Sequence, residues 1–163
     1  MCELDKAVVP GGHGTEVNDE RSEVALAPRH SKNVLVRAPN GLVASSDRQV
    51  GRELARILAQ CGLAPVLAST VVDTGVALFR HEVSIVLSND WLGDGDYEDI
   101  LRLRDRSDGQ VPVIVVSRTG DWTEYLAAIG QGVFDYLAYP PIPGDLQRVI
   151  RNALGEGQYR DAA

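Results

Sequence analysis

Short apolar segments alternate with amphipathic segments along most of this chain, and this pattern leaves few folds open to it. Five apolar runs occur at 42–44, 65–68, 85–87, 113–116 and 134–138. Each is followed by a stretch with apolar residues at helical spacing, and the last stretch reaches residue 154. Strict alternation of strand and helix is typical of a parallel sheet with right-handed crossovers. The sequence therefore predicts an α/β fold: a doubly wound, flavodoxin-like, five-stranded parallel sheet in the order 2-1-3-4-5.

Four of the predicted helices have an apolar stripe that we expect to face the sheet. Ser46 and Gln49 form a plausible capping box at the start of the first helix, and Gly62 is placed to end it. The expected inward residues are Val50, Leu54, Ile57, Leu58 and Cys61 in the first helix, Val72, Val76 and Phe79 in the second, Trp122, Tyr125, Leu126 and Ile129 in the fourth, and Leu146, Val149, Ile150 and Ala153 in the last.

The periodic pattern divides the chain into three parts. Residues 1–32 contain Pro and Gly with scattered charges and are predicted to be a flexible extension, 33–155 the folded domain, and 156–163 a C-terminal tail. No signal peptide or long apolar window is present, and the two cysteines are far apart, so we expect a cytoplasmic protein without a membrane span. The formal charge of −7 argues against direct binding to nucleic acid.

Several segments at the predicted strand ends resemble the receiver domains of two-component response regulators. They are the loop Leu92-Gly93-Asp94-Gly95-Asp96, Ser117 at the end of the fourth strand, and the stretch from Phe134 to Pro140. The resemblance covers residues 41–154. It implies a module that accepts a phosphoryl group from a histidine kinase onto an aspartate, with help from Mg²⁺, a lysine and a hydroxyl residue.

The chemistry implied by the resemblance is mostly missing from this chain. The metal-binding acidic pair falls on Ser45 and Ser46, the phosphoacceptor on Asn89, and the lysine on Tyr139. Only Ser117, at the hydroxyl position, and Tyr136, at the aromatic switch position, keep a matching residue type.

These replacements have direct chemical consequences. The amide of Asn89 lacks the charge of a carboxylate nucleophile, and two serine hydroxyls offer no charge to Mg²⁺. Lys6 and Lys32 are the only lysines in the chain, and both precede the predicted domain. We therefore expect no enzyme activity, no cofactor and no metal site.

Two alternatives remain open on the sequence alone. A shift of one residue would make Asp90 the phosphoacceptor, although strand alternation should turn Asp90 away from the side of Asn89. A flavodoxin-like domain could instead bind a small anionic ligand on a rim formed by Ser45, Ser46 and Ser117. The acidic run from Asp90 to Asp99 lacks the spacing of a calcium loop and predicts a solvated loop that leads into a helix.

The sequence thus favours a stand-alone receiver-like module in phosphorelay signalling that takes no phosphate and acts by binding proteins. The expected partners are a histidine kinase, a transcription factor or another regulator. By resemblance, the fourth helix, fifth strand and last helix form the partner surface, which could also support a homodimer. We place Trp122, Tyr125, Tyr136 and Arg148 on it.

Overall fold

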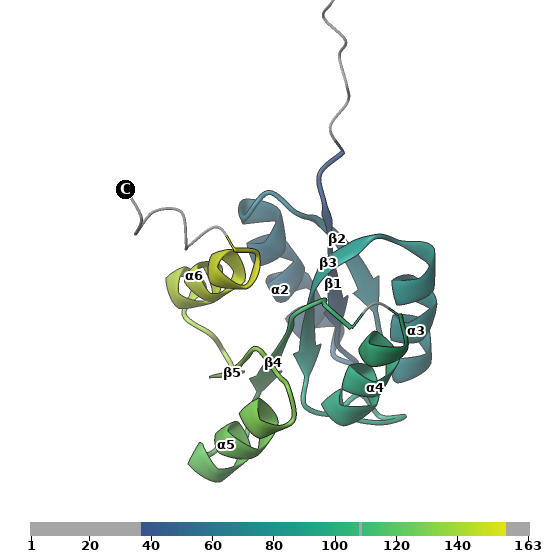
Figure 1. The fold of residues 1–163 in the computed structure, drawn as a ribbon. Coiled ribbons are helices and arrows are strands. Elements are labelled where there is room, and N and C mark those ends of the chain that lie inside the picture. The colour runs from purple at the N-terminus through teal and green to yellow at the C-terminus, as the bar shows by residue number, and fades with distance from the viewer. Residues whose placement is uncertain (1–36, 108, 156–163) are drawn as a thin grey trace, which may run out of the picture. The chain divides into compact units, whose positions relative to one another are not determined.

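A parallel sheet of five strands in the order β2-β1-β3-β4-β5 forms the centre of the computed structural model, which describes residues 37–107 and 109–155 (Figure 1). The strands are β1 (Asn40–Ala44), β2 (Ala64–Ala68), β3 (Val83–Asn89), β4 (Val113–Ser117) and β5 (Asp135–Ala138). The helices are α2 (Arg48–Gln60), α3 (Val71–Arg80), α4 (Tyr97–Ser107), α5 (Trp122–Gly130) and α6 (Pro143–Ala153). The predicted fold class and strand order are confirmed. The predicted extension 1–32 and tail 156–163 lie outside the described residues.

Helices cover both faces of the sheet. On one face, α2 and α6 pack over Val43, Leu87 and Val116, while on the other α3, α4 and α5 pack over Leu42, Val86 and Val115. All six of these strand residues are fully buried. Apolar side chains on both sides of each central strand explain why the runs in the sequence are continuous.

Helix α2 buries the predicted stripe, but a different residue caps it. Val50, Leu54, Ile57 and Leu58 are buried as expected, and Gly62 has the positive φ of a residue that ends a helix. The predicted cap, Ser46, is exposed, and Asp47 is the N-cap instead. Its carboxylate accepts hydrogen bonds from the backbone N–H groups of Gln49 and Val50, at 2.9 and 3.2 Å.

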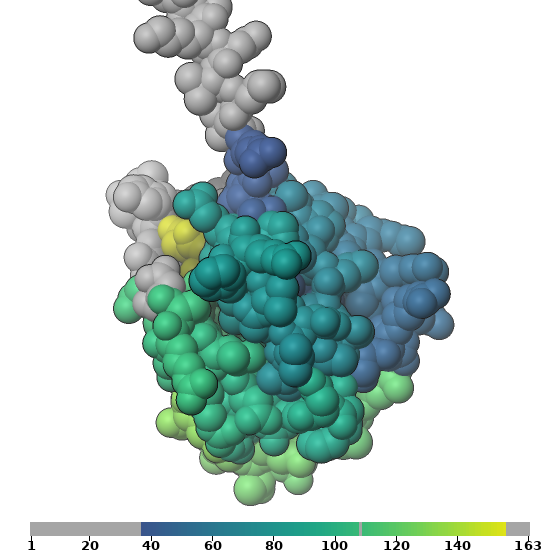
Figure 2. Space-filling model, turned by 90° about the vertical axis from the view of Figure 1, so that its right-hand side faces the viewer, coloured from purple at the N-terminus to yellow at the C-terminus, as the bar shows by residue number. Residues whose placement is uncertain are grey.

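The predicted inner stripe of α3 is wrong. Val72, Val76 and Phe79 are 69%, 43% and 90% exposed, whereas Thr74 and Ala77 are the buried residues of this helix. The small side chains allow α3 to lie close to α4: a Cβ atom on Gly75 would meet the side chain of Leu103 at 3.4 Å. The larger apolar residues of α3 are left exposed. Helix α3 itself lies on the side of the molecule that Figure 2 turns toward the viewer.

The inner face of α5 also differs from the prediction. Ala128 is its buried residue and Tyr125 is partly buried, while Trp122, Leu126 and Ile129 are exposed. The helix follows its N-cap Asp121 and has only nine residues, so a single narrow stripe of it reaches the sheet. In α6 the predicted Leu146, Val149 and Ile150 are buried, and Ala153 is partly buried against the same cluster.

Carboxylates of the acidic loop between β3 and α4 accept hydrogen bonds from the N-termini of two helices. The carboxylate of Asp94 accepts hydrogen bonds from the backbone N–H groups of Val71 and Val72 at the start of α3, and these bonds hold its pKa below the ordinary value. Asp96 accepts in the same way from Glu98 and Asp99 at the start of α4. The loop leads into the N-terminus of α4, as predicted, and Asp94 also ties it to α3. No helix among the described residues is long and apolar enough to cross a membrane.

The exposure of Phe79 can be tested by comparing two substitutions. We expect Phe79→Ser to change the free energy of unfolding by no more than about 0.5 kcal/mol, because the side chain has few contacts within the chain. Leu54→Ala should cost about 2 to 5 kcal/mol, because it empties a fully buried site. Urea unfolding of dilute protein measures both. Equal losses would contradict the outward placement of Phe79.

Candidate functional site

The open rim of the sheet lies at the C-terminal ends of β1, β3, β4 and β5, where the predicted site residues occur. Side chains of β3 alternate: Leu87 belongs to the cluster under α2 and α6, and Val86 to the cluster under α3 and α4. The strand ends at Asn89, so Asn89 and Asp90 point to opposite sides. Two separate groups of polar side chains result.

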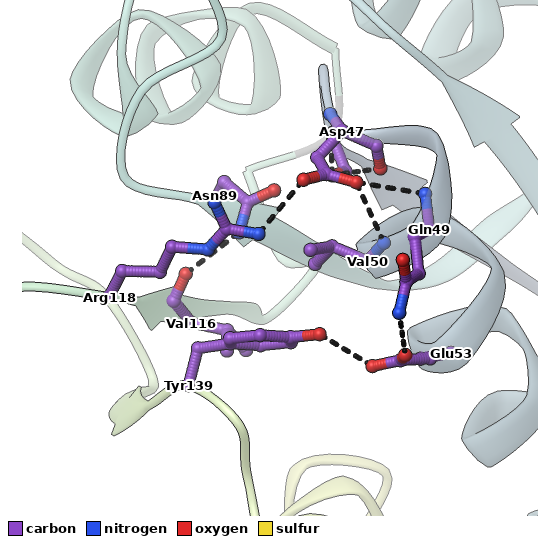
Figure 3. A network of polar contacts seen from close by, with 9 residues as sticks. Asp47, Gln49, Val50, Glu53, Asn89, Val116, Arg118 and Tyr139 are labelled. Carbon is purple, nitrogen blue, oxygen red and sulfur yellow. Dashed lines mark hydrogen bonds and ion pairs between the residues drawn. The ribbon is translucent and has the colours of Figure 1, made fainter.

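The first group is centred on an ion pair. A guanidinium nitrogen of Arg118 lies 2.8 Å from the carboxylate of Asp47, and both side chains are partly exposed (Figure 3). The backbone N–H of Val50, the Arg118 guanidinium and the backbone N–H of Gln49 together hold the pKa of Asp47 below its ordinary value. Arg118 thus binds the residue that caps α2 and joins the end of β4 to the start of that helix.

Tyr139 extends this group toward α2. The Arg118 guanidinium carbon lies 5.3 Å from the centroid of the Tyr139 ring, within the range of a cation–π contact. The Tyr139 hydroxyl donates a hydrogen bond of 2.5 Å to the carboxylate of Glu53, which also accepts from Gln49. The bond from Tyr139 lowers the pKa of Glu53, and the same bond raises the pKa of Tyr139. At the position where the resemblance expects a lysine, the chain therefore has a neutral donor that is already bound to a carboxylate.

Asn89 lies beside this group and uses its own amide locally. Its side-chain N–H₂ donates a hydrogen bond of 3.0 Å to the backbone carbonyl of Val116 on the neighbouring strand (Figure 3). A carboxylate could not donate this bond, so the asparagine is matched to a position where the strand presents an acceptor.

The three serines of the predicted rim do not form one site. Ser45 is 6% exposed, lies under α2 and exchanges hydrogen bonds with the backbone of Asp47. Ser46 is exposed. Ser117 is fully buried, and its hydroxyl donates to Asp90 instead. The hydroxyl groups of Ser45 and Ser117 therefore serve separate local bonds, and the alternative of one anion site on this rim finds no support in their placement.

The second group lies on the other side of the sheet. The Ser117 hydroxyl donates a hydrogen bond of 2.7 Å to the carboxylate of Asp90 and accepts one from the backbone N–H of Thr119. Tyr136 is only 8% exposed, and its hydroxyl donates to Glu124 of α5 at 3.1 Å. Burial is the largest cause of a raised pKa at Tyr136. The tyrosine at the switch position is thus turned inward and bound.

Several solved structures share this architecture. A response-regulator receiver-domain protein from Clostridium thermocellum superimposes with a TM-score of 0.66 at 21% identity, covering 74% of this chain and 98% of that one. The receiver domain of a putative LuxO repressor protein from Vibrio parahaemolyticus gives a TM-score of 0.68 at 17% identity, covering 77% and 97%. A beryllofluoride-activated NtrC4 receiver-domain dimer gives 0.67 at 21% identity, covering 72% and 97%. The chain has the receiver-domain fold. No protein-family model and no curated protein matches the sequence.

The rim of this receiver fold does not suit a divalent cation. In the part of the chain that the structure describes, no three His, Cys, Asp or Glu side chains are grouped so that they could hold a metal ion. Asp47 is neutralised by Arg118, and Asp90 is a single carboxylate on the opposite side of β3. Mg²⁺ keeps its waters unless carboxylates or phosphates replace them, so the donor set does not fit Mg²⁺.

Sequence reasoning missed three members of the first group: Asp47, Glu53 and Arg118. Arg118 follows Ser117 directly, and this position at a predicted strand end was a usable signal for a cation at the rim. The sequence has no lysine in the domain, but Arg118 supplies a positive charge there. Glu53 gave no signal, because its contact with Tyr139 joins residues 86 positions apart.

The predicted partner surface is only partly exposed. Trp122 is 70% exposed and stacks on Tyr125, with ring centroids 5.0 Å apart, and Arg148 is exposed beside Asp145. Tyr136 is buried, so its place on that surface is a wrong prediction. Gly120 explains the difference: a Cβ atom there would collide with the Tyr136 ring, and only glycine leaves room for the inward position.

The Asp47–Arg118 pair predicts a pH-dependent stability. The pKa of Asp47 is lowered in the folded chain from an ordinary value of 3.8, so its contribution to the free energy of unfolding is present above about pH 4 and is lost as the pH falls through the folded-state pKa. Arg118→Gln removes part of that lowering. We expect the stability difference between the natural chain and this variant to be largest near neutral pH and to shrink in acid.

Urea unfolding over a series of pH values measures this difference. Arg148→Gln is the matched control, because Arg148 pairs with Asp145 within one exposed helix turn and should matter little at any pH. An Arg118→Gln effect that does not vary with pH would contradict the assigned role of the pair.

Proposed function

We propose that this chain is a receiver-like module of two-component or phosphorelay signalling that takes no phosphate and acts by binding other proteins. One observation carries the proposal: β3 of a receiver fold ends in Asn89, whose amide is bound to the Val116 carbonyl. At the strand end where the resemblance places the phosphoacceptor, the side chain offers no oxygen nucleophile.

The charges around Asn89 support the same proposal. Transfer of a phosphoryl group needs cations over the developing negative charge and a metal held by carboxylates. The only cation of the first group, Arg118, already pairs with Asp47 and lies over Tyr139. Glu53 accepts from Tyr139 and Gln49. Every charged member of the group therefore has a partner within the chain.

The second group supports a module held in one arrangement. Tyr136 is buried and bonded to Glu124, and Ser117 is bonded to Asp90. Without a phosphoryl group to pull on Ser117, these bonds have no competitor at the rim. Any switching then comes from a partner that binds one arrangement better than another. No catalytic step, cofactor or metal is needed, and we infer that the module acts in the cytoplasm.

A second candidate is phosphoacceptance by Asp90. Its carboxylate lies 2.7 Å from the hydroxyl of Ser117, one of the two residues that match the residue type expected from the resemblance. Both Asp90 and Glu124 lie close enough to Tyr136 to raise its pKa. Because the described residues include no group of three acidic, His or Cys side chains that could hold a metal, and Asp90 has no ion-pair partner among them, we place this candidate second.

Incubation of the full chain with acetyl phosphate and Mg²⁺, followed by intact-mass measurement, separates these two candidates. We expect no added phosphoryl mass, because neither the nucleophile nor the metal ligands are present around Asn89. The Asn89→Asp variant should also stay unlabelled, since it restores only one of the missing groups. A label on the natural chain that disappears in Asp90→Asn would establish the second candidate and reject the first.

The proposed partner surface is the exposed apolar patch of α5 together with the start of α6. Trp122, Leu126 and Ile142 are 70%, 53% and 67% exposed, and Trp122 is held flat against Tyr125. Exposed aromatic side chains of this kind often provide much of the binding energy of an interface. Solved receiver folds include the NtrC4 dimer, and we propose that this surface binds a histidine kinase, a transcription factor or another regulator, with a homodimer as the alternative occupant.

Trp122→Ala tests this surface. Against a histidine kinase or regulator encoded beside this chain, we expect the variant to bind at least about tenfold more weakly, because a large exposed aromatic is removed. Isothermal titration calorimetry measures the affinity, and Phe79→Ser on the opposite side of the molecule is the control. Equal binding by the natural chain and Trp122→Ala would reject α5 as the contact.

A further inference from the structure

We infer that two copies of this chain associate through the outer face of α3, in an antiparallel, two-fold arrangement. This α3 surface consists of Val72, Val76 and Phe79 with Leu103 of α4 beside them, and it lies on the side shown in Figure 2. The inference goes beyond the proposed function, which uses the α5 surface and leaves α3 unoccupied.

The distribution of residues on α3 is the first observation. Its largest apolar side chain, Phe79, is 90% exposed, and Val72 is 69% exposed, while the inner side of the helix is built from Thr74, Gly75 and Ala77. The helix thus has small residues on its inner side and large apolar residues on its outer side. This is the arrangement expected of a helix whose outer side is also buried, by a partner. Contiguous exposed apolar side chains are a mark of an interaction surface.

The shape of this surface is the second observation. Val71, Val72, Gly75, Val76, Phe79 and Leu103 line a shallow groove of about 590 Å³ between α3 and α4. Gly75 leaves the groove open over Leu103, whose side chain is the nearest neighbour a Cβ would meet. A bulky side chain from outside, such as a second Phe79, can enter such a groove.

The charges on α3 favour a second copy as the occupant. Helix α3 has Asp73 in its first turn and Arg80 in its last turn, and both side chains are exposed. The outer face of α3 is therefore acidic at one end and basic at the other, and it complements itself when turned by 180°.

The spacing along α3 gives the register. Asp73, Val76 and Arg80 follow each other at i, i+3 and i+7, on one side of the helix. With Val76 at the two-fold axis, Asp73 of one copy lies near Arg80 of the other, and the reverse pair forms as well. Neither Asp73 nor Arg80 has an ion-pair partner within residues 37–107 and 109–155, so both are available for these contacts.

Sedimentation of the full chain from about 1 to about 300 µM tests for the dimer. We expect a concentration-dependent monomer–dimer equilibrium for the natural chain, and a dissociation constant at least about tenfold higher for Phe79→Ser, which removes the largest apolar side chain of the α3 surface. Trp122→Ala is the matched control: it removes an equally exposed aromatic from the α5 surface and should leave the equilibrium unchanged.

Charge reversal tests the arrangement itself. Asp73→Arg and Arg80→Asp should each weaken the dimer several-fold, because like charges then face each other across the axis. The double variant Asp73→Arg/Arg80→Asp should restore the natural dissociation constant to within about a factor of two, because the swapped charges pair again. Val76→Cys, with Cys2→Ser and Cys61→Ser, should form a disulfide-linked dimer under mild oxidation, and Leu126→Cys in the same background should not.

Three results would overturn the inference. The first is a natural chain that stays monomeric at every concentration, which would leave a different protein as the occupant of α3. The second is a dimer that is lost in Trp122→Ala but kept in Phe79→Ser. The third is a double charge-swap variant that dimerises more weakly than either single variant. None of them depends on whether the chain accepts phosphate, so this test and the phosphodonor test fail independently.

Discussion

The ion pair between Asp47 and Arg118 determines what the open rim of this sheet can do. It joins the start of α2 to the loop after β4, and it places a positive charge over the ring of Tyr139. In the receiver fold, this is the region where the resemblance expects carboxylates for a metal and a lysine for a phosphoryl group. Here Asp47 and Arg118 pair with each other, so neither charge is left without a partner that a ligand would have to supply.

The sheet could be predicted from the sequence because each central strand is buried on both faces. Val113–Ser117, for example, reads as an uninterrupted apolar run that ends in a small hydroxyl residue, and it forms β4. Helix α2 followed from the same rule, since its buried side chains pack against the sheet of the same chain. Helix α3 did not, because an apolar pattern records burial without saying what provides it. Val72 and Phe79 are apolar at helical spacing and still lie outside.

Only those parts of the site that depend on residues adjacent in the sequence could be predicted. Strand alternation correctly separated Asn89 from Asp90, because it depends on neighbouring residues alone. The Arg118–Asp47 contact joins positions 71 apart in the chain, and Tyr139 reaches Glu53 across 86. Such pairs depend on how α2 lies against the sheet. Tyr136 was placed on the partner surface by resemblance alone, and the missing Cβ of Gly120 leaves room for its ring inside.

The loop after β3 connects the rim to the α3 surface. Asp94 follows Asp90 by four residues, and its carboxylate binds the first two N–H groups of α3. A displacement of this loop therefore moves the end of α3 that holds Val72 and Asp73. In a chain that accepts phosphate, such a loop would pass a chemical signal to the helix. A dimer through α3, as inferred above, would place its contacts beside the helix end that Asp94 caps, four residues from Asp90 and its bond to Ser117. Such association would follow mass action and would therefore depend on the concentration of the chain.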